Sequence, residues 1–258
     1  MELSNAVTLI TGGASGLGEA TARYFAHNGA IVYILDLNSE KGMALQAGNA
    51  RITFIKTDVT DENAVQTSIN LIIAKEQRLH IAISCAGISE ARKTVGKVGG
   101  VYGPHSLESF DKTMRINLFG TFNILRLSAA VMESNPPNSE GERGIIINTA
   151  SIAAYDGQIG QVAYAASKGA IISMTLPAAR DLAKSGIRVM TIAPGLFETP
   201  LLAALPEDAR TSLGQQVPFP SRLGKPHEFA HLAKSIVENP MLNGETIRLD
   251  GAIRMAPK

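Results

Sequence analysis

Short apolar runs rich in β-branched residues alternate with helix-like stretches along the chain, and this alternation limits the possible folds more than any other feature. Seven such runs lie at residues 7–10, 31–35, 52–57, 81–85, 144–149, 187–193 and 245–249. They are apolar throughout, which is typical of parallel strands that helices cover on both faces. Helical crossovers between such strands are right-handed. The sequence therefore predicts an α/β chain with a doubly wound, seven-stranded parallel sheet.

Two stretches depart from this alternation, although no repeat or change in composition divides the chain. Residues 91–105 are rich in glycine, and residues 196–224 contain four prolines beside an apolar segment at 201–205 that resembles a short helix. Long irregular segments of a compact domain are commonly functional. We therefore predict a single domain over residues 1–258, with a substrate loop at about 91–105 and a lid at about 196–224.

Charge and cysteine content narrow the possible partners and compartment. The chain has 24 Lys and Arg against 23 Asp and Glu, a net charge of +1, so it lacks the basic excess of a general nucleic-acid binder. Cys85 is the single cysteine, which favours a reducing compartment. No stretch approaches the roughly 18 apolar residues of a membrane span, and a glycine turn after ten residues leaves no room for a signal peptide. We expect a cytoplasmic protein without nucleic-acid or membrane partners.

A glycine-rich turn lies between the first predicted strand and the first predicted helix. It reads TGGASGLG, and its predicted cofactor contacts are Gly12, Ser15, Gly16, Leu17 and Gly18. Glycines allow a tight turn and close approach to a pyrophosphate, and the N–H groups of the helix N-terminus attract anions. Such turns can also be purely structural, but the strand–turn–helix context favours a dinucleotide site.

Asp36 ends the second strand, eighteen residues after Gly18. A carboxylate at this place accepts hydrogen bonds from the adenosine ribose hydroxyls and repels a 2′-phosphate. The neighbouring Ser15 and Leu37 carry no positive charge that could pair with that phosphate. NAD is therefore favoured over NADP, and the alternative is that Asp36 merely caps the next helix.

A second constellation has the composition of a proton-transfer site. Tyr164 and Lys168 are four residues apart in a helical stretch at 163–174, so they share one face, and Ser151 directly follows a predicted strand. The phenol of a free tyrosine has a pKa near 10. It acts as a base at neutral pH only if this pKa falls by about three, which requires roughly 4 kcal/mol of stabilisation of the phenolate. The Lys168 cation, helped by the positive charge of an oxidised nicotinamide, is expected to lower this pKa, while Ser151 can donate a hydrogen bond to the substrate oxygen.

With these motifs, the chain resembles the classical short-chain dehydrogenase/reductase superfamily over essentially its whole length. Further matching positions are Asp58-Val59, Cys85-Ala86-Gly87, Asn117 and Pro194-Gly195. The resemblance implies a Rossmann fold in which Asp58 and Val59 lie at the adenine, and Ala86 and Gly87 lie near the adenosine ribose beside Cys85. It also implies that Pro194 and Thr199 lie near the nicotinamide, with Lys168 on the nicotinamide ribose. Asn117 would belong to a proton relay that holds a water near Lys168, or alternatively mark a kink in a long helix.

Longer runs at 145–161, 174–200 and 216–254 resemble one branch, the type II 3-hydroxyacyl-CoA dehydrogenases, also called hydroxysteroid dehydrogenases. This resemblance implies NAD-dependent oxidation of an L-3-hydroxyacyl-CoA thioester by a homotetramer, with Ser151, Gln158 and Tyr164 at the substrate. Oxidation of a hydroxysteroid or a short-chain secondary alcohol is the alternative. A non-catalytic NAD-sensing scaffold is a more remote one.

The segment from His227 to His231 matches the HExxH pattern of zinc proteases. In the predicted helix after Pro226, both histidines fall on the polar side together with Lys234 and Glu238. No further histidine follows as a third ligand, so we expect no metal site.

Overall fold

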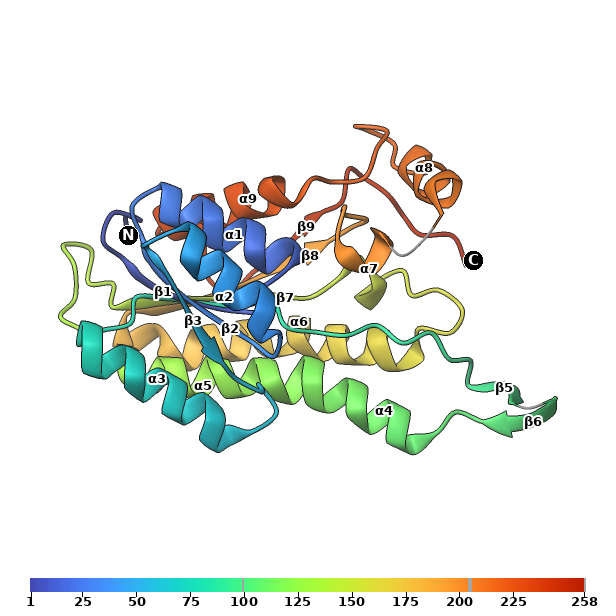
Figure 1. Cartoon of the computed structure of the whole chain (residues 1–258), viewed down its shortest axis with the longest axis horizontal. Coiled ribbons are helices and arrows are strands. Elements are labelled where there is room, and N and C mark those ends of the chain that lie inside the picture. The colour runs from blue at the N-terminus through green and yellow to red at the C-terminus, as the bar shows by residue number, and fades with distance from the viewer. Residues whose placement is uncertain (99, 204–205, 258) are drawn as a thin grey trace.

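Seven parallel strands form one twisted sheet in the computed structural model, which describes residues 1–98, 100–203 and 206–257 (Figure 1). The strands are β1 (Val7–Thr11), β2 (Ile31–Asp36), β3 (Ile52–Lys56), β4 (Ile81–Ser84), β7 (Gly144–Thr149), β8 (Ile187–Pro194) and β9 (Thr246–Leu249). Their order across the sheet is β3-β2-β1-β4-β7-β8-β9, and every pairing is parallel. The predicted doubly wound, seven-stranded sheet is confirmed.

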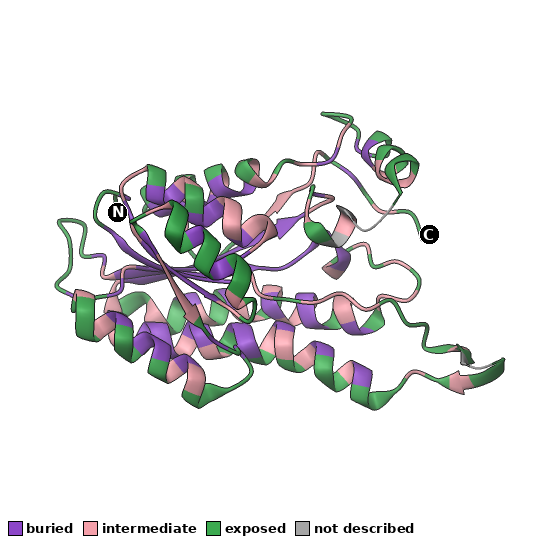
Figure 2. Cartoon of the chain, viewed as in Figure 1, coloured by how far each residue is buried: buried purple, intermediate pink, exposed green. Residues whose placement is uncertain are grey.

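Helices cover both faces of the sheet. One layer holds α1 (Gly16–His27), α2 (Ser39–Gly48) and α9 (Pro226–Glu238), and the other holds α3 (Glu62–Glu76), α4 (Leu107–Met114), α5 (Gly120–Met132) and α6 (Val162–Leu182) (Figure 1). The central strands β1, β4, β7 and β8 are wholly buried and the edge strands β3 and β9 are mostly half-buried, whereas the outer helix faces are exposed (Figure 2). Of the helices in the described ranges, none has both the length and the apolar character to cross a bilayer.

Successive residues of each strand pack into opposite layers. In β1, Leu9 joins the cluster under α3 and α5, while Ile10 joins the cluster under α1 and α9 that contains Phe25 and Phe229. Both layers are largely apolar, so most side chains on both faces of a strand are apolar as well. This two-sided burial explains why the strands are continuous apolar runs in the sequence.

The two stretches predicted to be irregular contain more regular structure than expected. Residues 91–105 hold an antiparallel hairpin, β5 (Val95–Val98) and β6 (Val101–Pro104), which projects from the body of the molecule (Figure 1). Gly100 lies in its turn with φ +86°, where a side chain would be strained. The 196–224 stretch contains α7 (Pro200–Ala203) and α8 (Glu207–Gln215). Residues 99, 204, 205 and 258 lie outside the described chain, and with them part of each predicted loop and the end of the predicted 201–205 helix.

Three short helical turns complete the described chain. A π-helical turn, η1 (Arg115–Phe119), joins α4 to α5, and 3₁₀ turns lie at η2 (Ile152–Ala154) and η3 (Ala183–Ser185). Two of these turns lie beside the cavity described next: η2 follows β7, and η1 carries Asn117. π-turns inside helices are rare and are frequently found at functional sites.

Candidate active site

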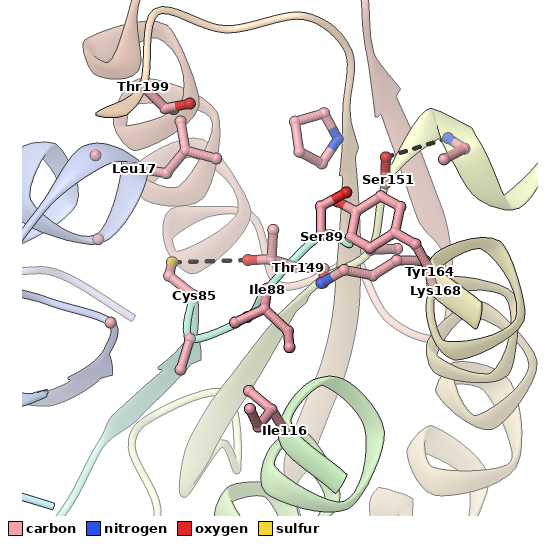
Figure 3. Close-up of a pocket in the computed structure, with 18 of the residues that line it drawn as sticks. Leu17, Cys85, Ile88, Ser89, Ile116, Thr149, Ser151, Tyr164, Lys168 and Thr199 are labelled. Atoms are coloured by element: carbon pink, nitrogen blue, oxygen red, sulfur yellow. Dashed lines mark hydrogen bonds between the residues drawn. The ribbon is translucent and has the colours of Figure 1, made fainter. Parts of the chain in front are cut away.

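The carboxyl ends of the central strands open into a cavity of about 1130 Å³. Open parallel sheets place their ligands at this edge. All but one of the predicted catalytic, cofactor-binding and substrate-binding residues line the cavity. They are Gly12, Ser15, Gly16, Leu17, Gly18, Asp36, Asp58, Val59, Cys85, Ala86, Gly87, Ser151, Gln158, Tyr164, Lys168, Pro194 and Thr199. The exception is Asn117. Figure 3 shows side chains from the glycine turn, β4, β7 and α6 converging on this space.

The glycine turn packs too closely for larger residues. A Cβ on Gly18 would lie 2.2 Å from the Gly12 carbonyl oxygen, and a Cβ on Gly12 would lie 2.8 Å from the Ala86 nitrogen. Ser15 precedes α1 and makes no capping hydrogen bond through its side chain. The backbone therefore runs along the cavity with the positive end of the α1 dipole facing it, an arrangement suited to a pyrophosphate.

Asp36 ties the glycine turn to the loop after β2. Its Oδ2 accepts a hydrogen bond from the Ala14 nitrogen at 3.0 Å, and its Oδ1 accepts one from the Asn38 nitrogen at 2.9 Å. The cap of α2 is Asn38, whose side chain accepts from the Lys41 nitrogen. The alternative role of Asp36 as a helix cap is therefore wrong, and its carboxylate faces the cavity from the end of β2.

Asp58 and Val59 line the cavity between β3 and α3. The Asp58 Oδ1 accepts from both the nitrogen and the hydroxyl of Thr60, at 2.9 and 2.8 Å. The Val59 carbonyl accepts from the Asn123 side chain of α5 at 3.2 Å. These bonds fix both residues at the cavity wall, and their contact with an adenine ring stays a prediction.

Ser151, Tyr164 and Lys168 come together at the other end of the cavity (Figure 3). Ser151 lies two residues after the end of β7 and caps η2, where its Oγ accepts from the Ala153 nitrogen at 3.1 Å. Tyr164 and Lys168 occupy successive turns of α6, and the Lys168 Nζ lies 5.8 Å from the centre of the Tyr164 ring. The Lys168 ammonium donates to the Thr149 carbonyl at 2.7 Å.

Burial controls the protonation of this pair. It lowers the pKa of Lys168 to about 8 because the ammonium is removed from water. It also raises the pKa of Tyr164 above its usual value, an effect that hydrogen bonding with Ser151 partly offsets. The lowering of the Tyr164 pKa that we expect from Lys168 with an oxidised nicotinamide concerns the cofactor-bound enzyme and stays a prediction, whereas burial in the protein itself acts in the opposite direction. The physical reason is that loss of solvent penalises the phenolate more than its surroundings stabilise it.

Asn117 lies behind the cavity wall in η1 and is fully buried. Its Oδ1 accepts from the Ile88 nitrogen at 2.8 Å, and its Nδ2 donates to the Ile88 carbonyl at 2.9 Å and to the Ser167 hydroxyl at 3.0 Å. The amide therefore joins the chain after β4 to α6, one residue from Lys168. The π-turn matches the kink that was the structural alternative, and the relay role of Asn117 stays a prediction.

The profile described as short chain dehydrogenase matches residues 6–210 of the chain. The chain belongs to the short chain dehydrogenase family. It is thus an oxidoreductase rather than the non-catalytic scaffold considered from the sequence.

Among relatives in this family, 3-hydroxyacyl-CoA dehydrogenase type-2 of Homo sapiens is 56% identical over 253 residues, covering 97% of this chain and 96% of the relative. The protein of the same name from Drosophila melanogaster is 54% identical over 257 residues, covering 99% and 100%. The crystal structure of 3-hydroxyacyl-CoA dehydrogenase type-2 from Mycobacterium avium superposes with a TM-score of 0.92 at 44% identity, covering 98% of each chain.

A more distant family structure bears on the cofactor. The 3-ketoacyl-(acyl-carrier-protein) reductase from Brucella melitensis, solved with NADH, has a TM-score of 0.85 and 26% identity, covering 98% of this chain and 100% of that one. The cavity here fits such a group by its own geometry. Gly12 and Gly18 leave no room for side chains where the turn meets the cavity, and a Cβ on Gly87 would lie a tight 3.2 Å from the Asn117 Oδ1, so small residues keep the backbone close along this wall. Family and geometry together indicate a nicotinamide dinucleotide.

Several lining residues escaped the sequence analysis, among them Ile88, Ser89, Thr149, Leu196, Phe197 and Met255. Thr149 could have been found, because it ends β7 immediately before Ala150 and Ser151. Its hydroxyl donates to the Cys85 Sγ at 3.6 Å, while its carbonyl accepts from Lys168. Burial raises the pKa of Cys85 to about 11, so this thiol is protonated and not a nucleophile. Met255 could not have been predicted from its neighbours in the sequence, because it reaches the cavity only when the C-terminal segment packs against Ile152 and Val217.

The HExxH segment serves a structural purpose. Glu228 accepts two hydrogen bonds from Arg222, at 2.7 and 2.9 Å, and one from the Lys225 nitrogen at the start of α9. The bonds from Arg222 hold the pKa of Glu228 at about 2. His227 and His231 are exposed on the outer face of α9. Within the described ranges, no three His, Cys, Asp or Glu side chains lie close enough together to hold a metal.

Proposed function

We propose that this chain is a NAD-dependent dehydrogenase that oxidises an L-3-hydroxyacyl-CoA to the 3-ketoacyl-CoA, in one catalytic domain over residues 1–258. The observation that carries the proposal is that Ser151, Tyr164 and Lys168 share one cavity with the glycine turn and Asp36. Identities of 54% and 56% to proteins named 3-hydroxyacyl-CoA dehydrogenase type-2 support the substrate class.

In this mechanism the chain handles the proton and orients the substrate, and a bound nicotinamide would supply the hydride acceptor. The Ser151 hydroxyl donates a hydrogen bond to the reacting oxygen, and the Tyr164 oxygen takes the hydroxyl proton. Lys168 binds the cofactor ribose and provides positive charge as Tyr164 ionises. Because burial keeps Tyr164 protonated at neutral pH, we expect alcohol oxidation to accelerate as the pH rises.

NAD is proposed over NADP because Asp36 is the charged group at the end of β2. Its two oxygens are fixed by the Ala14 and Asn38 nitrogens, so the carboxylate cannot swing away from a 2′-phosphate. Leu37 beside it is 61% exposed and offers no cation. Charge repulsion at this position favours a free ribose hydroxyl.

The substrate end of the cavity suits a chain with an apolar tail. Ile152, which directly follows Ser151, lines it and packs in one cluster with Leu196, and Gln158 also belongs to the lining. We place the substrate loop at 91–105 and the lid at 196–224, since the backbone nitrogen of Arg92 donates to the Gly160 carbonyl near Gln158, and Leu213 of α8 reaches the cavity. A steroid also fits a cavity of about 1130 Å³, which keeps hydroxysteroid oxidation as the second candidate.

A homotetramer is the assembly that we propose. Phe119 and Phe122 near the start of α5 are 58% and 50% exposed, and Leu176 on α6 is 44% exposed. Apolar surface on neighbouring helices of one layer is typical of subunit interfaces. Light scattering coupled to gel filtration tests this assembly, and a monomer would contradict it. The single thiol supports a reducing, cytoplasmic compartment.

The decisive experiment measures NADH formation from L-3-hydroxybutyryl-CoA, its D enantiomer, a hydroxysteroid and a short secondary alcohol. We expect the highest kcat/KM for the L-thioester. Tyr164→Phe is the matched control, because it removes one hydroxyl and leaves the cavity shape. A higher kcat/KM for the steroid would favour the second candidate, and failure to oxidise the thioester would contradict the proposal.

A further inference from the structure

The C-terminal segment from Ile253 to Pro257 lies along the substrate end of the cavity. Ile253 is buried against Ile152 and Val217, with Leu196 and Met255 packed on the same cluster. Ile152 directly follows Ser151, so this cluster lies beside the residue that orients the reacting oxygen. Ile253 and Met255 are two residues apart and contact the same cluster, as expected for an extended segment.

Hydrogen bonds fix this segment on both sides of Met255. Before it, the Ile253 carbonyl accepts from the Arg248 Nη2 at 3.1 Å. After it, the Ala256 carbonyl accepts from the Gln158 Nε2 at 3.0 Å, and the Pro257 carbonyl accepts from the Ile159 nitrogen at 2.9 Å. Because the backbone is held before and after Met255, its side chain stays at the cavity wall.

The loop that holds the segment is itself anchored. The Arg248 Nη2 that bonds the Ile253 carbonyl also pairs with Asp156 at 2.6 Å, and the guanidinium stacks 4.8 Å from the centre of the Tyr155 ring. Arg248 further bonds Asp250 at 2.7 Å. One arginine thus connects β9, the loop after η2 and the C-terminal segment, which makes the wall a built part of the fold.

We infer that Met255 determines how long an acyl tail the enzyme accepts. The inference rests on the proposed function and names the wall that the tail meets. Met255 packs on the apolar cluster of Ile152, Val217 and Ile253, so this part of the wall offers an acyl tail an apolar surface. A methionine thioether is flexible and apolar, and at a fixed position it limits tail length by its volume.

The test compares kcat/KM for L-3-hydroxybutyryl-CoA, L-3-hydroxyoctanoyl-CoA and L-3-hydroxydodecanoyl-CoA in the wild type, Met255→Ala and Met255→Phe. Removing three heavy atoms from the wall should raise the dodecanoyl-to-butyryl ratio about tenfold, because a methylene in an apolar pocket changes kcat/KM by about 10- to 200-fold. The larger phenylalanine should lower the same ratio. Met241→Ala is the matched control, since Met241 is 88% exposed and lies outside the cavity lining.

The outcomes separate the two proposals. A wild type that oxidises none of the thioesters overturns the proposed function and the role of Met255 with it. A wild type that oxidises them, with chain-length profiles of both Met255 variants matching that of Met241→Ala, overturns the role of Met255 alone. Opposite shifts in the two Met255 variants support it.

Discussion

Two buried cations at opposite edges of the same sheet differ in how completely their donors are satisfied. Arg188 stands near the start of β8 and is 6% exposed, while Lys168 reaches the carboxyl ends of the strands from α6 and is 4% exposed. Arg188 donates to the Glu142 carboxylate and to the carbonyls of Ile236, Val237, Asn239 and Leu242. Its charge is therefore fully compensated, and it ties β8 to the end of α9.

Lys168 has a single hydrogen bond within the described chain, to the Thr149 carbonyl. An ammonium has three donors, so this buried charge lacks compensation, and its pKa falls to about 8. At the amino edge of the sheet, where the strands begin, the buried charge of Arg188 therefore stabilises the fold. The carboxyl edge keeps buried donor capacity for a ligand, which is typical of active sites.

The largest expected effect is a loss of catalytic activity at the carboxyl edge that leaves the fold intact. Tyr164→Phe should lower kcat by about 10²- to 10⁴-fold because it removes the group that accepts the substrate proton. NADH binding, measured by fluorescence titration, should change little. Retention of wild-type turnover would rule out the assigned role.

The opposite outcome is expected at the amino edge. Arg188→Met removes the donor shared by the Glu142 carboxylate and four carbonyls and leaves Glu142 paired with the Met1 ammonium at 3.1 Å, so the free energy of unfolding should fall by about 3 kcal/mol. Denaturant titration measures this loss, and kcat per folded molecule should be unchanged. Lys234→Met is the matched control, because the pair between Lys234 and Glu238 has the same 2.7 Å separation as the buried pair but lies at the surface. Equal effects of the two substitutions would contradict the comparison.

The uncompensated charge of Lys168 predicts a pH effect on stability. Between a folded pKa of about 8 and an unfolded value of about 10.5, the unfolded state binds more protons. The free energy of unfolding therefore rises with pH, by about 2 kcal/mol from pH 7.5 to 9.5. Denaturant titrations of the wild type and Lys168→Met should differ by this amount in their pH dependence, and parallel curves would show that the lysine is solvated.

The carboxylates at the two edges also differ in whether a cation compensates their charge. Glu142 is paired with Arg188, whereas Asp36 accepts hydrogen bonds only from backbone nitrogens among the described residues. Asp36→Asn keeps the size and one acceptor oxygen but removes the charge that opposes a 2′-phosphate. The ratio of kcat/KM for NAD to that for NADP should fall at least about tenfold, an effect of roughly 1.4 kcal/mol. An unchanged ratio would exclude Asp36 from ribose selection.

The smallest expected effect lies at the amino edge, at His80. Its Nδ1 accepts from the Val7 nitrogen at 2.9 Å, and burial lowers its pKa, with Arg78 adding to the shift. The unfolded state therefore takes up this proton more readily, and stability falls as the pH drops below 6.5. His80→Asn keeps an acceptor for the Val7 nitrogen. This substitution should reduce the fall in melting temperature below pH 6.5, measured by thermal unfolding. The same fall in melting temperature below pH 6.5 in both proteins would show that a group other than His80 causes it.

Local patterns predicted much of the fold and most of the candidate site. The continuous apolar runs required burial on both faces, which gave the parallel sheet, and the glycine turn and the spacing of Tyr164 and Lys168 are properties of short segments. The β5–β6 hairpin was missed because cross-strand pairing, and not local pattern, makes it regular. The effect of burial on the Tyr164 pKa could not be predicted, because the sequence contains no measure of solvent exclusion around the phenol.

The sequence by itself determined the strands of the main sheet, the edge of that sheet at which a dinucleotide site is expected, and the side chains that are candidates for proton transfer. The tertiary structure decided which buried charges are compensated, as the difference between Arg188 and Lys168 shows. It also brought Met255 from the end of the chain to a wall beside Ser151. These features depend on contacts between segments far apart in the chain, whose distances and solvent exposure exist only after packing.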